Sequence, residues 1–238
     1  MENFSMIAKT FFGFEEILAK ELQQLGAQKV EQGTRMVSFV GDKGFMYKAN
    51  LALRTALKIL KPIKKFKAFN EKSLYEGIKN MDWSNYLNEN QTFVVETTLH
   101  SELFTHSQFV ALKTKDAIVD QFRELHGKRP SIDKEFPDLR IHVHIDRDLC
   151  TVSIDTSGAS LHHRGYRTAT NIAPINEVLA AGMLLLSGWE GKSHFLDPMC
   201  GSGTFIIEAL MMLTDRAPGL VRRFGFNGWN GHNHDLWM

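Results

Sequence analysis

Apolar residues recur at helical and strand spacing through the first 65 residues. The positions that predict a first helix are Phe14, Ile17, Leu18, Leu22 and Leu25. Because they lie three or four residues apart, they share one face, and Gly26 follows where such a helix would stop. Runs at 6–11 and 36–40 predict strands, and a second apolar face from Phe45 to Leu60 predicts a helix that Pro62 ends. This β-α-β-α order predicts an α+β, ferredoxin-like sandwich over residues 1–65.

The next block, residues 66–160, repeats the mixture of helix and strand. A short helix is expected at 73–80 and a longer one at 107–125, with a Val- and Thr-rich strand at 92–99 between them. Alternation of apolar residues with two histidines predicts a half-buried strand at 141–145. A turn leads from it into a second strand at 150–154. This block is again expected to be α+β.

The pattern changes after about residue 168. Residues 176–187 are strongly apolar and predict a helix, with Pro174 near its first turn. A short buried strand at 194–197 and a helix at 204–213 form a βα unit, with a glycine-containing turn between them. Such a unit belongs to an α/β domain with an open, mostly parallel sheet.

Composition limits the classes of function. The hydrophobic and charged fractions, 43% and 23%, are those of a soluble globular protein, and a net charge of +1 means that any nucleic-acid-binding surface must be local. Two cysteines without a CxxC pair, and ten histidines without completing ligands, indicate no metal site. No signal peptide opens the chain and its apolar runs are too short to span a bilayer, so we expect a cytoplasmic protein without a membrane partner.

The turn from Asp197 to Thr204 occupies the position where open α/β sheets bind ligands. Gly201 and Gly203 let the backbone approach a ligand, and the following helix directs N–H groups toward it. A phosphate loop of the GxxxxGK[ST] type is excluded, because no lysine follows Lys192. A dinucleotide fingerprint lacks its third small residue, since bulky residues follow Thr204.

S-adenosylmethionine fits this turn better, because it carries no phosphate. Its carboxylate suits a helix N-terminus, and its ammonium and sulfonium groups suit a carboxylate such as Asp197. A dinucleotide, or a tight corner that holds no ligand, are the alternatives that the residues leave open. Cys200 lies in the turn, but nothing near it indicates an activated thiolate, so no nucleophilic role is expected.

Four stretches resemble one known family. LDPMCGSGTFIIEA, residues 196–209, resembles the S-adenosylmethionine-binding motif of amino-methylating methyltransferases, and more closely that of bacterial RNA methyltransferases with a THUMP domain. SGASLHHRGYR, residues 157–167, is similar to the family's segment between its RNA-binding and catalytic parts. APINEVLAA, residues 173–181, is similar to its cofactor-pocket helix, and APGL, residues 217–220, to the stretch after the turn. The resemblance covers the whole chain and is firmest over 155–238.

The resemblance implies a ferredoxin-like domain at 1–65, a THUMP RNA-binding domain at 66–160, a linker at 161–170 and an incomplete Rossmann-like methyltransferase domain at 171–238. It implies methylation of a guanine N2 in large-subunit ribosomal RNA, with S-adenosylmethionine as cofactor; related THUMP enzymes act on transfer RNA. The cofactor turn would comprise Asp197, Pro198, Cys200, Gly201, Gly203 and Thr204. Pro174 and Glu177 would be secondary pocket residues.

The family's NPPY-like catalytic motif is absent, because the chain has six prolines and no two are adjacent. The acidic residue that binds the cofactor ribose cannot be placed either. We therefore expect the N-terminal portion of a longer enzyme, with its catalytic residues elsewhere and no methyl transfer by this chain alone. The alternatives are a non-catalytic RNA-binding module, a transfer-RNA guanine-N2 methyltransferase and a DNA adenine methyltransferase.

Basic residues form three candidate RNA contacts. The densest run comprises Arg54, Lys58, Lys61, Lys64, Lys65 and Lys67, the first three of which are expected on one helix face. A weaker group ends in a loop at Lys128 and Arg129. Arg164, Tyr166 and Arg167 combine guanidinium groups with a ring suited to stacking. The structural alternatives are a solvated helix face for the first two groups and an interdomain hinge for the third.

Overall fold

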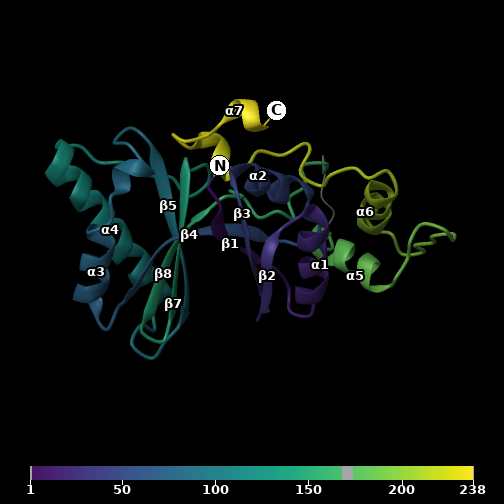
Figure 1. Ribbon diagram of the computed structural model, residues 1–238, viewed down its shortest axis with the longest axis horizontal. Coiled ribbons are helices and arrows are strands. Elements are labelled where there is room, and N and C mark those ends of the chain that lie inside the picture. The colour runs from purple at the N-terminus through teal and green to yellow at the C-terminus, as the bar shows by residue number, and fades with distance from the viewer. Residues whose placement is uncertain (1, 168–173, 238) are drawn as a thin grey trace. The chain divides into compact units, whose positions relative to one another are not determined.

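The computed structural model describes residues 2–167 and 174–237, and the chain divides into two compact units (Figure 1). Unit 1 comprises residues 2–59, 159–167, 174–224 and Trp237. Unit 2 comprises Leu60–Gly158 and Gly225–Leu236. Within the described ranges, no helix has the length and apolar character needed to cross a bilayer.

Unit 1 begins with a ferredoxin-like order of strands and helices. The elements are β1 (Phe4–Lys9), α1 (Glu15–Leu25), β2 (Gln28–Gly33), β3 (Met36–Gly41), α2 (Lys43–Ala52) and the start of β4 (Lys58–Lys67). β3 is antiparallel to both β1 and β2. Leu18 and Leu22 of α1 are fully buried, so the apolar face that predicts this helix forms core. Gly26 ends α1 in the left-handed conformation, with φ 100°, which glycine adopts without steric cost.

One strand is missing from the expected elements, and one expected helix is too long. β2 is a strand that the sequence pattern does not mark, because its residues other than Val30 and Gly33 are polar and its pairing with β3 is made by the backbone. The helix expected to continue to Leu60 ends at Ala52, where the next residue is extended, with ψ 125°. Pro62 lies inside β4, beside a register shift in the pairing with β8 (Leu149–Asp155). An irregular ladder tolerates the missing N–H of proline, so Pro62 marks an irregular strand and not a helix end.

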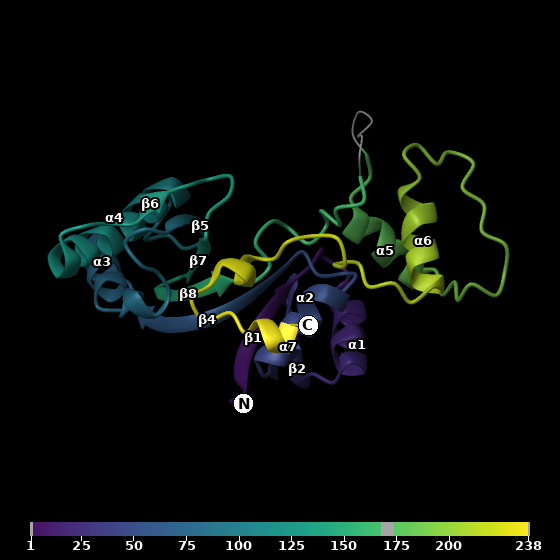
Figure 2. The ribbon, with the colours of Figure 1, turned by 90° about the horizontal axis from the view of Figure 1, so that it is seen from above.

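Unit 2 is the α+β block that the pattern predicts. In addition to β4 and β8 it contains α3 (Glu71–Lys79), the short helix η1 (Trp83–Asn85), β5 (Thr92–His100), α4 (Ser107–His126), β6 (Ser131–Ile132), β7 (Leu139–Asp146) and η2 (Gly225–Gly228). Its strands follow the order β4-β8-β7-β5-β6, antiparallel from β4 to β7 and parallel from β7 to β6. Figures 1 and 2 show α3 and α4 side by side along this sheet. Trp83, Phe93 and Phe122 are the largest fully buried side chains of the hydrophobic core of unit 2.

The later part of unit 1 is helical in the residues described. α5 (Glu177–Leu186) packs on α6 (Thr204–Leu213) and also contacts α1. A further short helix, α7 (His234–Trp237), has His234–Leu236 in unit 2 and Trp237 in unit 1. Both long helices lie where the pattern predicts them. The strand expected at 194–197 is not formed, and Leu196 is 84% exposed. A strand needs a neighbour to satisfy its backbone groups, and between residues 174 and 237 the structure contains no strand that could serve.

Candidate functional site

The glycine turn that precedes α6 is open. Gly201 and Gly203 have φ values of 53° and 75°, in the left-handed region. No atom lies within 4 Å of where a Cβ would stand at either position, apart from the immediate chain neighbours. Gly203 is the N-cap of α6 and supplies no side chain to the first turn of the helix. The turn therefore presents unshielded backbone to a ligand.

Asp197 places an unsatisfied carboxylate oxygen at the start of this turn. Its Oδ1 accepts a hydrogen bond from the Met199 N–H at 3.2 Å. Its Oδ2 is buried and, among the described residues, has no hydrogen-bond partner. A buried carboxylate oxygen without a partner is costly, so a positively charged donor would stabilise it. The predicted residues Pro198, Cys200 and Gly201 are exposed beside it.

The start of α5 contains Glu177, a predicted secondary pocket residue, which is linked to the turn through Arg167. Asn176 caps this helix, its side chain accepting from the N–H groups of Val178 and Leu179 at 2.9 and 3.2 Å. Pro174 is exposed, whereas Glu177 is buried. The Glu177 carboxylate accepts a hydrogen bond from Nε of Arg167 at 2.5 Å, so it is already paired.

Arg167 lies at the glycine turn, where it was not expected. Its Nη1 donates to Ser202 Oγ at 3.0 Å, and its Nη2 donates to Thr204 Oγ1 at 2.8 Å. Nη2 also donates to the backbone carbonyl of Ile175 at 3.0 Å. These bonds direct the Arg167 guanidinium into unit 1, toward the glycine turn and away from its predicted contact with RNA.

The predicted contact of Arg164 with RNA is wrong, because the Arg164 side chain is only 2% exposed and offers RNA no surface. Its Nε lies 3.5 Å from Oε1 of Glu208, which is fully buried in α6. Its Nη1 and Nη2 donate to the carbonyls of Leu161 and Arg54 at 2.9 and 2.6 Å. Arg164 is therefore an internal residue of unit 1.

Tyr166 joins the same cluster. Its hydroxyl donates to Oε1 of Glu208 at 3.2 Å, which points the tip of the ring into the protein. Burial raises the pKa of Tyr166, and the Glu208 carboxylate adds to that effect. Burial also raises the pKa of Glu208, while the Arg164 guanidinium opposes the rise. The Tyr166 hydroxyl is thus an internal group of unit 1.

The other basic candidates separate into internal and exposed groups. The guanidinium of Arg54 donates to the carbonyls of Met211 and Arg216 at 3.2 and 3.0 Å, which makes it a structural link within unit 1. The expected helix face that it would share with Lys58 and Lys61 does not exist, since those two residues lie on β4. The exposed candidates in unit 2 are Lys64, Lys65, Lys67, Lys128 and Arg129.

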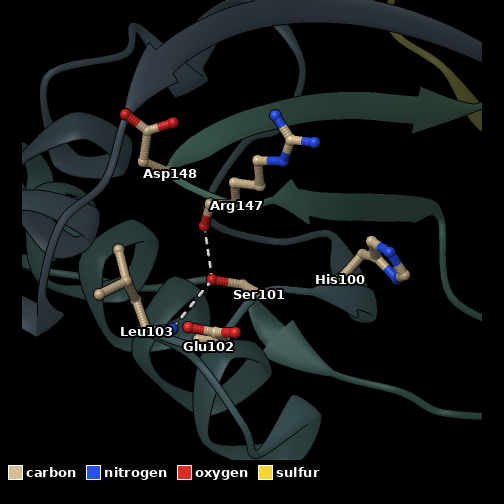
Figure 3. A pocket seen from close by; sticks show the side chains of 6 residues that line it. All are labelled: His100, Ser101, Glu102, Leu103, Arg147 and Asp148. Carbon is tan, nitrogen blue, oxygen red and sulfur yellow. Dashed lines mark hydrogen bonds between the residues drawn. The ribbon is translucent and has the colours of Figure 1, made fainter.

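A cavity of about 610 Å³ lies in unit 2, at the ends of β5 and β7 (Figure 3). Its lining comprises His100, Ser101, Glu102, Leu103, Arg147 and Asp148. Two hydrogen bonds hold the turn at Arg147. The Arg147 N–H donates to the His100 carbonyl at 2.7 Å, and the Ser101 hydroxyl donates to the Arg147 carbonyl at 2.5 Å. Asp148 is in turn paired with Lys67 at 3.1 Å. The lining mixes cationic and anionic groups and favours neither sign of ligand.

The two cysteines should differ sharply in reactivity, which tests the exposure of the turn. Both are free thiols; Cys200 is exposed, and Cys150 is buried on β8, where burial raises its pKa to about 12. Because the thiolate is the reactive form, we expect N-ethylmaleimide at pH 7.5 to modify one cysteine per folded chain, at Cys200. Mass spectrometry of peptides would identify the modified residue. Equal modification of Cys150 without denaturant would contradict this burial.

Three family descriptions match successive parts of the chain. Residues 5–60 match the RlmL ferredoxin-like domain, residues 68–155 the THUMP domain, and residues 164–235 the RMKL-like methyltransferase domain. These matches confirm the expected fold class, in which ferredoxin-like and THUMP domains are followed by a methyltransferase domain.

Individual relatives agree with these matches. The chain is 44% identical over 230 residues to the ribosomal RNA large subunit methyltransferase K/L of Marinomonas sp. (strain MWYL1). The aligned residues cover 95% of this chain and 32% of that relative. A predicted N6-adenine-specific DNA methylase from Listeria monocytogenes str. 4b F2365 is 33% identical, with a TM-score of 0.87 over 100% of this chain and 62% of that one. SMU.472 complexed with SAH is 34% identical, with a TM-score of 0.85 over 100% and 63%. The chain thus spans about a third of the curated relative and less than two thirds of either solved structure.

Proposed function

We propose that this chain, which joins ferredoxin-like and THUMP domains to part of a methyltransferase domain, binds S-adenosylmethionine and RNA in an enzyme that methylates ribosomal RNA. The observation that carries the proposal is the open glycine turn beside the unpaired, buried Oδ2 of Asp197. The ribosomal RNA methyltransferase relative and the structure complexed with SAH support the choice of substrate and cofactor. The finer part of the proposal is that the acceptor is the N2 of a guanine in large-subunit RNA.

The residues of the turn fit the amino-acid end of the cofactor. Asp197 would accept hydrogen bonds from its ammonium group, and the N–H groups at the start of α6 would receive its carboxylate. Gly201 and Gly203 would let the cofactor lie against the backbone. Pro198, Cys200 and Pro174 are the exposed neighbours, whereas Thr204 and Glu177 would act through their bonds to Arg167. When bound, S-adenosylmethionine supplies the methyl group.

Each proposed domain would have its own role; the domains are 1–65, 66–160, the linker 161–170 and 171–238. Residues 66–160 would bind RNA and residues 171–238 would hold half of the cofactor site. No two prolines of the chain are adjacent, so an NPPY-like loop is not part of it. We propose that the 238 residues alone bind cofactor and RNA without transferring a methyl group. Tritiated methyl incorporation into ribosomal RNA by the purified chain would contradict that statement.

The acceptor can be identified by nucleoside mass spectrometry of a strain that lacks the complete gene. The proposal predicts loss of N2-methylguanosine from large-subunit ribosomal RNA, with transfer RNA and DNA unchanged. Complementation with the complete gene should restore the modification. Loss of N6-methyladenine from DNA, or of N2-methylguanosine from transfer RNA alone, would refute the proposed substrate.

Charge reversal on β4 tests the RNA-binding surface. Lys64 and Lys65 are exposed and adjacent, on the strand of unit 2 that follows the ferredoxin-like order. If both contact phosphates, the variant Lys64→Glu/Lys65→Glu should reduce the slope of log affinity against log salt by about 1.5, since each contact contributes roughly 0.7–0.9. Fluorescence anisotropy with a ribosomal RNA fragment at several KCl concentrations measures this slope.

Lys72→Glu is the matched control for this experiment, because its side chain is 83% exposed on α3 of the same unit. It makes the same kind of charge change outside the proposed surface. An unchanged slope in the double variant, or an equal change with Lys72→Glu, would remove Lys64 and Lys65 from the RNA site.

A further inference from the structure

The Arg167 guanidinium joins three segments of unit 1. It holds the Ile175 carbonyl and the Glu177 carboxylate at the start of α5, Ser202 within the glycine turn, and Thr204 at the first position of α6. Its side chain is 16% exposed and that of Glu177 is 5% exposed, so the bonds between them are shielded from water. One planar group thus fixes the turn against the neighbouring helix.

Within the turn, the Gly203 N–H donates to the Cys200 carbonyl at 2.7 Å and the Met199 N–H donates to Asp197 Oδ1 at 3.2 Å, but neither bond ties the turn to α5. Gly201 and Gly203 can occupy left-handed and right-handed conformations with similar ease, so their backbone is costly to order. The N-cap of α6 contributes no side-chain hydrogen bond to the first turn of the helix within the described residues. The bonds from Arg167 to the hydroxyls of Ser202 and Thr204 replace that missing restraint. Arginine suits this task because its donors form a rigid fork, whereas lysine offers a single ammonium group.

The charge of Arg167 is neutralised where it lies. Glu177 supplies a carboxylate at 2.5 Å, and both side chains are largely buried. An unpaired guanidinium beside the turn would repel a cationic ligand, whereas the pair is neutral. The pair can therefore hold the turn without opposing a ligand that carries ammonium and sulfonium groups.

We propose that Arg167 is a positioning residue of the cofactor site, which holds the glycine turn in its ligand-binding shape through Ser202 and Thr204. This inference rests on the proposed function for the identity of the ligand. It assigns to the cofactor site a residue outside both the turn and its helix, and it separates Arg167 from the RNA-binding surface.

The first test measures SAH binding by isothermal titration calorimetry to the whole chain. Arg167→Ala is expected to weaken binding by about 10–100-fold, because loss of charge-assisted bonds leaves the turn unrestrained. Arg167→Lys should restore little of the affinity, and added guanidinium at low millimolar concentration should restore part of it in Arg167→Ala. Ser202→Ala, which removes one acceptor only, should weaken binding less, and the double variant should be no worse than Arg167→Ala.

Arg222→Ala is the matched control, since the Arg222 guanidinium donates to the carbonyls of Ala159, Ser160 and His163 in the same unit. It should keep wild-type affinity for SAH. Wild-type affinity in Arg167→Ala, an equal loss in Arg222→Ala, or additive effects of Ser202→Ala and Arg167→Ala would overturn the inference.

The second test needs no ligand, so it separates this inference from the proposed function. Hydrogen exchange of peptides covering 199–207 should be faster in Arg167→Ala and in Ser202→Ala than in the wild type, with the peptides of α1 unchanged. Unchanged exchange at 199–207 would overturn the positioning role. If exchange responds as expected but the wild-type chain does not bind SAH, the proposed ligand is wrong and the role of Arg167 in shaping the turn stands.

Discussion

Replacing Arg164 with methionine is expected to lower the free energy of unfolding by about 3–5 kcal/mol, the usual cost of removing one partner of a buried ion pair. Glu208 is fully buried and would lose its counter-charge, and the carbonyls of Leu161 and Arg54 would lose their donors. Urea unfolding followed by circular dichroism measures the change. The exposed Arg223→Met is the control and should change stability by less than about 0.5 kcal/mol.

The loss should depend on pH in a definite direction. The pKa of Glu208 is raised by burial, and removing Arg164 raises it further. Below the pKa of a glutamate in the unfolded chain, about 4.3, the carboxyl is neutral in both states and the variant loses least. As pH rises above that value, the unfolded chain releases the Glu208 proton, whereas the folded variant must keep it or bury an unpaired carboxylate. The loss of unfolding free energy in the variant therefore grows with pH. Adding Glu208→Leu to Arg164→Met should recover part of the stability at pH 8, and a larger loss in the double variant would refute this ion pair.

Asp197→Asn is expected to weaken SAH binding by about 10–100-fold, because a hydrogen bond to a charged group contributes about 1.5–3 kcal/mol. Asparagine keeps the oxygen that accepts from the Met199 N–H, so the turn should retain its shape. It replaces the unpaired Oδ2 with an NH2 group that faces the ligand's ammonium as donor against donor. Calorimetric titration of both proteins gives the affinity ratio.

Glu190→Gln is the control for this change of carboxylate to amide. Glu190 lies in the same unit before the turn, and its exposed side chain pairs with Lys192, two residues away. Its substitution should leave SAH affinity unchanged. Equal affinities of the wild type and Asp197→Asn would show that Asp197 does not hold the ligand's ammonium group.

The fold could be predicted where side-chain pattern and backbone structure agree. α1, α4, α5 and α6 each have an apolar face and lie close to the expected ranges. The pattern failed where backbone pairing alone decides the structure. β2 is mostly polar and is formed by its hydrogen bonds to β3. β4 carries apolar and basic residues at spacings that also suit a helix. The strand expected at 194–197 is not formed although its central residues are apolar, and Leu196 is exposed. An apolar run forms a strand only when a neighbouring strand exists.

The sequence motif contains only part of the candidate site. Asp197, Gly201 and Gly203 are adjacent in sequence, so a motif can show them together. Arg167 reaches the turn across a separation of many residues, and a basic side chain in sequence does not reveal whether it faces RNA, water or another helix. The same is true of Arg164 and Arg54, whose guanidinium groups donate to carbonyls far away in the sequence.

The central claim is that the turn from Asp197 to Thr204 holds S-adenosylmethionine, and modification of Cys200 tests it most directly. The rate of N-ethylmaleimide modification at Cys200 should be measured with and without saturating SAH, using adenosine at the same concentration as the control ligand. Because Cys200 is exposed in the free turn, bound SAH should slow its modification several-fold, whereas adenosine should not. Slowing should be lost in Asp197→Asn at the same SAH concentration. An unchanged rate in the wild type, with SAH shown by calorimetry to be bound, would place the ligand elsewhere and contradict the claim.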